Sequence, residues 1–440
     1  MLQRLFKLRE NHTNVKTEII AGVTTFMTLS YTIFVQPTVL SSCGMDFGAV
    51  LAATCIASAI ATFIMGLYAN YPIALAPGMG QNFFFAYTVV LGMGVSWQKA
   101  LGAVFISGLL FLLLSFFGFR EKLIDGIPDS LKEAIAVGIG LFIAMIGFQW
   151  AGIVVATPGS IVGLGNFHST PVLISAFGIL VTVVLVAARI RGALLLGIFA
   201  TALAGLACGI VRYRGIVGAI PSIGPTLFKL DILGALDLGL ASVIFVFFFL
   251  ALFDSVGTLI GVSNQAGLLV NNKLPRAREA LASDAFGSVA GAMLGTSTIT
   301  AYVESAAGVA EGGRTGLANM VTGLLMLAAL FFYPLSRMVG DGYQLPDGSR
   351  IYPVVAPALI VVGSMMLRNV RKIRWEDHTE AIPAFLTMAI MPFAFSITEG
   401  IAFGFISYAL LKTVTGRRRE VHPLVGLFAV LFVLRYIFLK

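Results

Sequence analysis

Runs of apolar residues long enough to cross a bilayer recur along the whole 440-residue chain, and the polar stretches between them are no longer than loops. A helix needs about 20 mostly apolar residues to span the hydrocarbon of a membrane. Only 11% of the residues are charged and 58% are hydrophobic, whereas a soluble domain has about 25% charged residues. Because so little polar surface cannot cover the chain in water, the runs predict an all-α polytopic membrane protein.

Hydropathy predicts fourteen membrane spans. They cover residues 17–40, 49–67, 72–91, 99–119, 130–155, 171–188, 192–211, 239–262, 281–295, 299–313, 316–335, 353–368, 379–396 and 398–414. Lys and Arg gather in the loops after spans 4, 6, 8, 12 and 14, although the loop after span 7 also carries some. Since cytoplasmic loops collect these residues, we expect a cell-membrane protein with both termini in the cytoplasm. The final apolar run, residues 422–440, is then predicted to be an interfacial helix.

The polar residues exclude several classes of protein. The net charge of +8 fits cytoplasmic loops, and no basic stripe interleaved with aromatic residues suggests a nucleic-acid partner. Cysteine and histidine residues show no metal-ligand or disulfide spacing, so we predict no metal and no cofactor. No nucleophile–base pair or phosphate-binding loop is present, which argues against an enzyme.

Two of the predicted spans are interrupted by Gly, Pro and polar residues. ALAPGMGQNFFFAY lies in span 3 and GTSTITAYVESAAGVAEGGRTG includes span 10, so each is the third span of a seven-span half. The offset from Met79 to Tyr302 equals the offset from Tyr31 to Asp254. An odd number of spans per half inverts the second half, and paired interruptions of this kind are the best sequence indication of a transporter's substrate site. Broken backbone is tolerated at membrane depth only inside protein or beside a watery cavity.

Two acidic residues stand out within the predicted spans, because Asp254 lies deep in span 8 and Glu304 lies in the interrupted span 10. A charge at the bilayer centre costs about 2.5–3.5 kcal/mol on insertion scales, so chance placement is a poor explanation. An ionised carboxylate accepts adjacent hydrogen bonds, which matches the N–H edge of a nucleobase. Burial favours its protonated form, so either acid could also carry a coupling proton. The alternative is a structural role, in which the carboxyl groups hold a helix break together.

Other residues near the interruptions could complete a binding site. Gly80 allows close backbone approach, Gln81 and Asn82 offer amides, and Phe83 offers a ring for stacking on a flat base. Phenylalanine more often packs in a core, and hydroxyls such as that of Thr258 more often bond to helix backbone. The predicted substrate-binding residues are Asp254, Glu304, Gly80, Gln81, Asn82, Phe83, Tyr302, Thr258 and Tyr31, with Asp254 and Glu304 also coupling protons.

The runs ALAPGMGQNFFFAYTVVLGMG, LFDSVGTLIGV and GTSTITAYVESAAGVAEGGRTG resemble the AzgA-like purine permeases of the nucleobase–cation symporter 2 family, within the nucleobase–ascorbate transporter superfamily. The likeness extends from TEIIAGVTTFMTLSYTIFVQP to HPLVGLFAVLFVLRY. It implies a uracil-permease-like fold with fourteen spans in a 7+7 inverted repeat. The implied core domain comprises residues 1–128 and 236–340, the gate domain residues 129–235 and 341–416, and the interfacial helix residues 417–440. Spans 3 and 10 would each hold a short strand, the second over Thr298–Tyr302, with the following glycines starting a half-helix.

The resemblance also implies proton-coupled uptake of adenine, guanine or hypoxanthine, with sodium as the less favoured ion and a homodimer as the expected assembly. Uracil and xanthine relatives carry Glu and often His where this chain has Asp254 and Thr258, and the purine branch commonly has an apolar residue in place of Gln81. The segments VVLGMGVSWQ and FISGLLF resemble guanine/hypoxanthine permeases more than adenine permeases, which favours guanine or hypoxanthine as the predicted substrate. A rival interpretation is a sulfate- or bicarbonate-type anion transporter of the same architecture, against which the two acids argue by charge repulsion.

Overall fold

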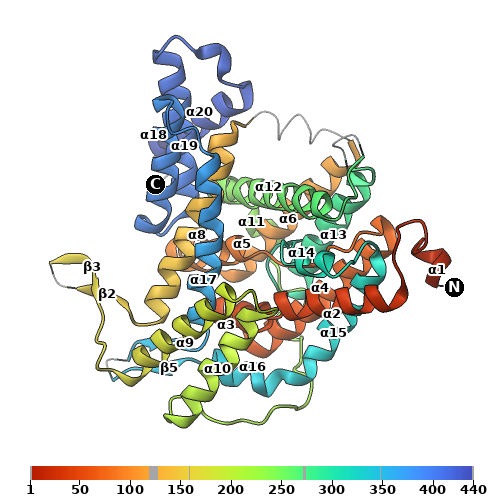
Figure 1. Cartoon of the computed structure of the whole chain (residues 1–440). Helices are drawn as coiled ribbons and strands as arrows, with labels where there is room; N and C mark the ends of the chain where they lie inside the picture. Colours follow the sequence, from red (N-terminus) through yellow and green to blue (C-terminus); the bar gives the residue numbers. More distant parts are fainter. Residues whose placement is uncertain (1, 118–126, 158, 271–273, 347, 439–440) are drawn as a thin grey trace.

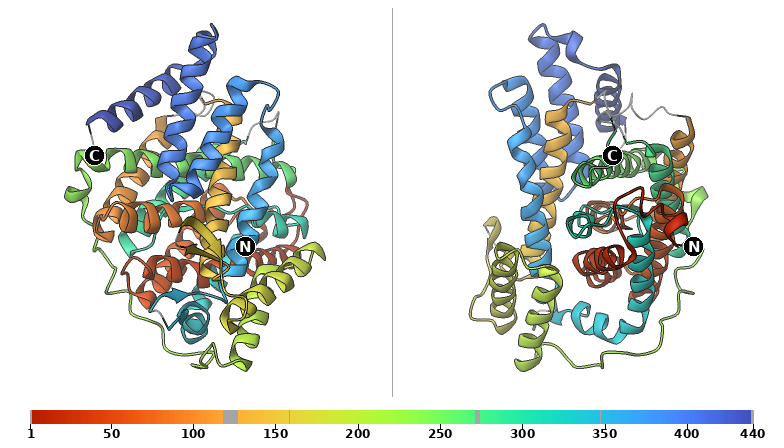
Figure 2. Two further views of the ribbon diagram at one scale, coloured as in Figure 1. Left: turned by 90° about the vertical axis from the view of Figure 1, so that its left-hand side faces the viewer. Right: turned by 45° about the vertical axis from the view of Figure 1, so that its right-hand side comes forward.

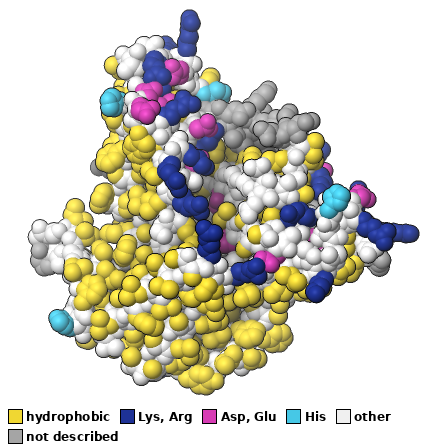
Figure 3. Space-filling view, in the orientation of Figure 1, with side chains coloured by type: hydrophobic (Ala, Val, Ile, Leu, Met, Phe, Trp, Pro, Cys, Tyr) yellow, Lys and Arg dark blue, Asp and Glu magenta, His cyan; other side chains and the backbone are white. Residues whose placement is uncertain are grey.

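The computed structural model describes residues 2–117, 127–157, 159–270, 274–346 and 348–438, which form mainly helices with three short two-stranded sheets (Figure 1). Within these residues, eight helical segments are long and apolar enough to cross a membrane. They are Val15–Ser41, Phe47–Ala69, Trp97–Ser115, Asp129–Trp150, Thr170–Ala187, Ala241–Gln265, Gly316–Gly340 and Ile397–Val414. Hydrophobic side chains cover most of the lower part of the face in Figure 3, as contact with lipid requires. The chain is therefore a multi-pass membrane protein.

One set of helices, called the central group here, packs around the two broken spans. It consists of α2 (Val15–Leu29), α3 (Thr32–Ser41), α4 (Phe47–Ile64), η1 (Met65–Ala69), α6 (Trp97–Phe117), α12 (Ala241–Gln265), α13 (Ala277–Leu294), α15 (Gly316–Ala328), η4 (Ala329–Phe332) and α16 (Tyr333–Gly340). Helix α15 lies against α2 and α4, while α6 lies against α12 and α13. The approach of α15 to η1 is so close that a Cβ on Gly316 would lie 1.9 Å from the carbonyl oxygen of Gly66.

A second set, called the flanking group here, stands beside the central group as upright helices in the right-hand view of Figure 2. It consists of α8 (Asp129–Trp150), α9 (Thr170–Ala187), α10 (Ala193–Ala207), α17 (Ala356–Met366), η5 (Leu367–Lys372), α18 (His378–Phe393), α19 (Ile397–Val414), η6 (Arg418–Glu420) and α20 (Pro423–Phe438). Helix α8 packs against α17 and α18, and α9 packs against α10 and α17. Small residues allow this, since a Cβ on Gly363 would lie 2.4 Å from the carbonyl oxygen of Gly140.

Several short elements lie outside these two groups and the broken spans. They are α1 (Leu2–Leu5), α11 (Ile232–Ala235), η3 (Leu238–Leu240), and the hairpins β2 (Val154–Thr157) with β3 (Ser160–Leu164) and β5 (Tyr343–Gln344) with β6 (Arg350–Ile351). The terminal helix α20 turns back along α19, where Arg435 Nη1 lies 2.9 Å from Glu399 Oε1. It also meets α12 through Phe428 and Phe245, whose ring centroids are 4.0 Å apart. Its place at the membrane interface stays a prediction.

The two interrupted spans meet as paired strands. Strand β1 (Leu75–Pro77) is followed by α5 (Met79–Phe83) and the π-helix η2 (Phe84–Gly92), and β4 (Ile299–Ala301) precedes α14 (Ser305–Ala310). The strands are antiparallel, with Ala76 opposite Thr300. This confirms the short strands predicted in spans 3 and 10.

The prediction that glycines start the second half-helix is wrong. Helix α14 begins at Ser305, and Gly312, with φ of 97°, follows its end, where a left-handed residue stops a helix. Gly308 lies inside α14, where the helix packs closely against α2. A Cβ at this position would lie 2.5 Å from the carbonyl oxygen of Ala21, so only glycine fits there. That glycine serves close packing, not helix initiation.

Candidate substrate site

Asp254 lies near the middle of α12, where this helix passes the paired strands. Its Oδ2 accepts hydrogen bonds from Gln81 Nε2 of α5 at 3.4 Å and from Thr300 Oγ1 of β4 at 3.3 Å. Gln81 and Thr300 are buried, whereas the Asp254 side chain is exposed. The carboxylate is therefore fixed on its protein side and open on the other.

Glu304 is the residue before α14 and is partly exposed. Tyr31, at the break between α2 and α3, donates its hydroxyl to Glu304 Oε1 at 3.0 Å. Thr28 donates to the backbone oxygen of Glu304 at 3.2 Å. The two carboxyl groups are close enough to interact electrostatically, and Tyr302 interacts with both. The structure thus brings the two predicted acids to one place from two different spans, α12 and the segment before α14.

The face of α12 that carries Asp254 borders open space. Gly257 and Gly261 follow Asp254 at helical spacing on that face, and a Cβ built on either would meet no atom within 4 Å. Val303, beside Glu304, is 62% exposed. Asp254 therefore faces open space, and the partly exposed Glu304 lies close to it, which leaves room for a ligand.

The other predicted site residues have different surroundings. Asn82 is fully buried, and its Oδ1 accepts from Ser297 Oγ. Tyr302 donates its hydroxyl to the carbonyl oxygen of Pro77, which ties the end of β4 to β1. Thr258 is partly buried, one turn after Asp254 on α12. Gly80 faces the flanking group, since its Cβ would lie 2.8 Å from Ile139 Cγ2 of α8.

An aromatic contact joins α5 and η2 to the flanking group. Phe83 is fully buried and stacks on Tyr87 with ring centroids 6.0 Å apart. Trp150 of α8 donates its indole N–H to the Tyr87 hydroxyl at 2.7 Å and packs on Tyr352 at 4.4 Å between centroids. Thr88 also donates to the carbonyl oxygen of Phe395 at 3.4 Å. This contact was not predicted from the sequence because its partners lie in distant segments and carry no motif.

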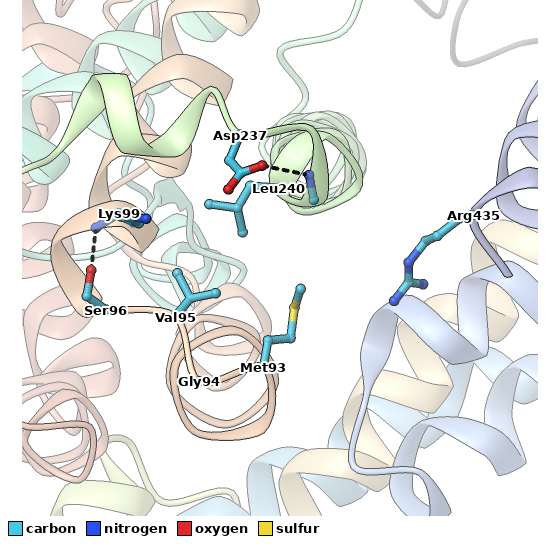
Figure 4. Close-up of a pocket in the computed structure, with 9 residues that line it drawn as sticks. Met93, Gly94, Val95, Ser96, Lys99, Asp237, Leu240 and Arg435 are labelled. Atoms are coloured by element: carbon cyan, nitrogen blue, oxygen red, sulfur yellow. Dashed lines mark hydrogen bonds between the residues drawn. The ribbon is translucent and has the colours of Figure 1, made fainter. Parts of the chain in front are cut away.

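A separate cavity of about 480 Å³ lies between α20 and the loops before α6 and α12 (Figure 4). Its lining residues are Met93, Gly94, Val95, Ser96, Lys99, Asp237, Gly239, Leu240 and Arg435. None of the predicted site residues lines it, so it is not the candidate substrate site. Within the described part of the chain, no group of three or more His, Cys, Asp or Glu residues is arranged to hold a metal ion.

Apolar helices arranged around two paired broken spans define a multi-pass membrane transporter. Residues 16–403 match the Permease family, and the chain belongs to this family, as the resemblance predicted. Because its members are permeases, the protein is a transporter and not an enzyme.

Two curated relatives and one solved structure illustrate this membership. Over 440 residues, the chain is 47% identical to the adenine permease AdeP of Escherichia coli (strain K12), covering 100% of this chain and 96% of that one. It is also 47% identical over 452 residues to the guanine/hypoxanthine permease PbuG of Bacillus subtilis (strain 168), covering 100% of each. The transmembrane domain of the cyanobacterial bicarbonate transporter BicA shares the fold, with a TM-score of 0.61 and 14% identity over 89% of this chain and 97% of that chain.

Proposed function

We propose that the protein takes up purine nucleobases across the cell membrane in symport with protons. The observation that carries this proposal is the convergence of Asp254 and Glu304 beside open space where the two broken spans meet. Curated relatives over the whole chain are permeases for adenine or for guanine and hypoxanthine. A purine is flat and neutral and carries N–H donors, so it complements acceptor groups in an apolar setting.

The two acids have different partners, which suggests different roles. Asp254 accepts from two uncharged donors and presents its free side to the open region. Glu304 is bonded to Tyr31, whose hydroxyl can donate to the carboxylate or accept from the carboxylic acid. Glu304 can therefore keep this partner in both protonation states. We assign base binding mainly to Asp254 and proton coupling mainly to Glu304.

Helix packing supports alternating access by a 7+7 inverted repeat. An inverted repeat requires each contact to have an equivalent in which the two halves are exchanged. The contact of α2 with α15 corresponds in this way to the contact of α12 with α6, and the contact of α4 with α15 corresponds to the contact of α13 with α6. In the flanking group, α8 with α18 corresponds to α17 with α9. The antiparallel pair β1–β4 joins the two halves. We propose fourteen spans, with residues 1–128 and 236–340 as the core domain and residues 129–235 and 341–416 as the gate.

The open side of the site is proposed to face the cytoplasm, with both termini on that side. A row of Lys and Arg side chains crosses the face of the molecule in Figure 3, between the flanking and central groups. Such residues collect on the cytoplasmic side of membrane proteins. Labelling of tags at the two ends in intact cells, compared with permeabilised cells, tests this orientation.

The preferred base is proposed to be guanine or hypoxanthine, because the segments VVLGMGVSWQ and FISGLLF favour these bases, with adenine as the alternative. Identity does not separate the two, because the chain is equally similar to an adenine permease and to a guanine/hypoxanthine permease. Competition of unlabelled adenine, guanine, hypoxanthine, xanthine and uracil against labelled purine uptake decides between them. Assembly as a homodimer remains part of the proposal, and its mass in detergent tests it.

Removal of either acid tests the proposed function. Glu304→Gln and Asp254→Asn should each reduce labelled purine uptake by at least about 100-fold, the scale of a lost charge-assisted contact of about 3 kcal/mol. The matched control is Asp129→Asn, because this acid is 82% exposed and, within the described residues, its ion pair is with Lys132. Wild-type uptake by both site variants at normal membrane levels would refute the proposal. Uptake that survives a protonophore but needs sodium would refute proton coupling.

A further inference from the structure

Both hydrogen bonds that Asp254 accepts reach the same oxygen atom. Gln81 Nε2 and Thr300 Oγ1 donate to Oδ2 from two different elements, α5 and β4. Among the described residues, no donor reaches Oδ1. A carboxylate oxygen has two lone pairs, so the protein occupies both acceptor positions of Oδ2. Oδ1 is the oxygen left for a ligand.

Gly78 makes this arrangement possible. A Cβ at Gly78 would lie 2.0 Å from Gln81 Oε1 and 3.0 Å from Thr300 Oγ1, so any larger residue would push both donors away. Gln81 is only 2% exposed and therefore lies behind the carboxylate, away from the open region. Its amide must turn the NH₂ group to Asp254, because the amide oxygen would be repelled by an ionised carboxylate. Gln81 thus acts on a ligand only through Asp254.

We propose that Gln81 and Thr300 are positioning residues that set base selectivity, because they limit Asp254 to contact with the base through one oxygen. This inference rests on the proposed function. A carboxylate that is free to turn can accept two parallel N–H bonds, as it does from arginine. Guanine offers such a pair in its ring N1–H and its 2-amino group, whereas hypoxanthine has only the ring N–H on that edge. With Oδ2 occupied, each base gives one N–H to Oδ1, so the intact site distinguishes guanine from hypoxanthine only weakly.

The consequence is a change in selectivity when the positioning donors are removed. Gln81→Met keeps the length of the side chain without its donor, and Thr300→Val keeps the branched shape without the hydroxyl. Each change removes one of the two bonds that hold Oδ2 on the protein side, so the carboxylate can turn and accept the second N–H of guanine. We expect the ratio of guanine to hypoxanthine affinity to rise about tenfold in each variant, the value of one hydrogen bond to a charged group. Gly78→Ala should act in the same direction, since it displaces both donors.

The experiment compares inhibition of labelled hypoxanthine uptake by unlabelled guanine and hypoxanthine in cells that produce wild type, Gln81→Met, Thr300→Val or Gly78→Ala. The control is Ser263→Ala, which removes a fully buried hydroxyl from α12 without a bond to Asp254 and should leave the ratio unchanged. For a variant that transports too little, the same ratio comes from the thermal shifts that the two bases give with purified protein.

The outcomes separate this inference from the proposed function. A ratio within about twofold of wild type in the two donor variants would overturn the inference, as would an equal loss of both bases, because a residue with a purely structural role weakens them together. If wild-type protein neither transports nor binds any purine, the proposed function itself is refuted. Purine uptake by wild type with an unchanged ratio in the variants would overturn the inference alone.

Discussion

A buried carboxylate of α2 holds the start of α15, and its removal should destabilise the protein strongly. Glu18 is fully buried, and its oxygens accept the backbone N–H groups of Arg314 at 2.8 Å, Thr315 at 3.3 Å and Ala318 at 3.2 Å. The first N–H groups of a helix have no partner inside that helix. A hydrogen bond to a charged group contributes about 1.5–3 kcal/mol, and an unpaired buried donor costs about 1–3 kcal/mol.

Glu18→Ala therefore removes an acceptor for three donors that water reaches poorly, although the Ala318 N–H also reaches the carbonyl oxygen of Thr315 at 3.3 Å. Because the helix end can relax in part, we expect a loss of about 3–5 kcal/mol in the free energy of unfolding, from about 1–3 kcal/mol for each donor left unpaired. The measurement is thermal unfolding of detergent-purified protein followed by tryptophan fluorescence. The control is Glu10→Ala, a 70% exposed acid whose pairing with Lys7 spans 3.8 Å, which should change stability by less than about 0.5 kcal/mol. A Glu18→Ala protein as stable as the Glu10→Ala protein would refute this assignment.

Two further changes test the contacts between helices. Tyr87→Phe leaves the buried Trp150 indole N–H without an acceptor, at a cost of about 1–3 kcal/mol. We therefore expect faster hydrogen exchange in η2, with exchange in α13 unchanged. An equal change of exchange in both segments would contradict the role of this bond in holding η2 against α8. Hydrogen bonds from Thr379 and the Arg417 guanidinium hold the pKa of Asp377 well below its usual range. The stabilisation that ionised Asp377 gives the folded state is therefore complete above about pH 3.9 and declines as the pH falls through its lower folded-state pKa. The difference in thermal stability between wild type and Asp377→Asn should accordingly shrink below about pH 4.

The broken spans could be predicted because their interruptions are visible in the sequence. Pro77 and Gly78 come directly after three apolar residues that are compatible with either a helix or a strand. Because proline cannot continue the hydrogen-bond pattern of a helix, the helix is predicted to break there. The equal offset between the halves then related span 3 to span 10, and Asp254 and Glu304 were assigned to one site because both lie close to these interruptions. The strand pair was predicted from the family resemblance and not from the local pattern.

The partners of the acids could not be predicted in the same way. Gln81 is 173 positions from Asp254, and Tyr31 is 273 positions from Glu304, so no local pattern records these bonds. The start of α14 was misjudged because Gly308 reads as a helix boundary in sequence, although its small size is needed for contact with α2. The bonds of Arg314 are also hidden from a local pattern, since its Nη1 donates to the carbonyl oxygens of Val309 and Gly313 near the end of α14.

The fold alone does not decide what this transporter carries, because the BicA domain, at 14% identity, has the same architecture and belongs to a bicarbonate transporter. The charge at the site separates the two cases. Two unit charges of the same sign 4 Å apart repel by about 4 kcal/mol at an effective dielectric constant of 20. An anion beside ionised Asp254 would therefore bind about 1,000-fold more weakly, whereas a neutral base with N–H donors is attracted by the same carboxylate. If Asp254 and Glu304 form the substrate site as proposed, we expect them to shift the preference of this fold from anions to hydrogen-bond donors.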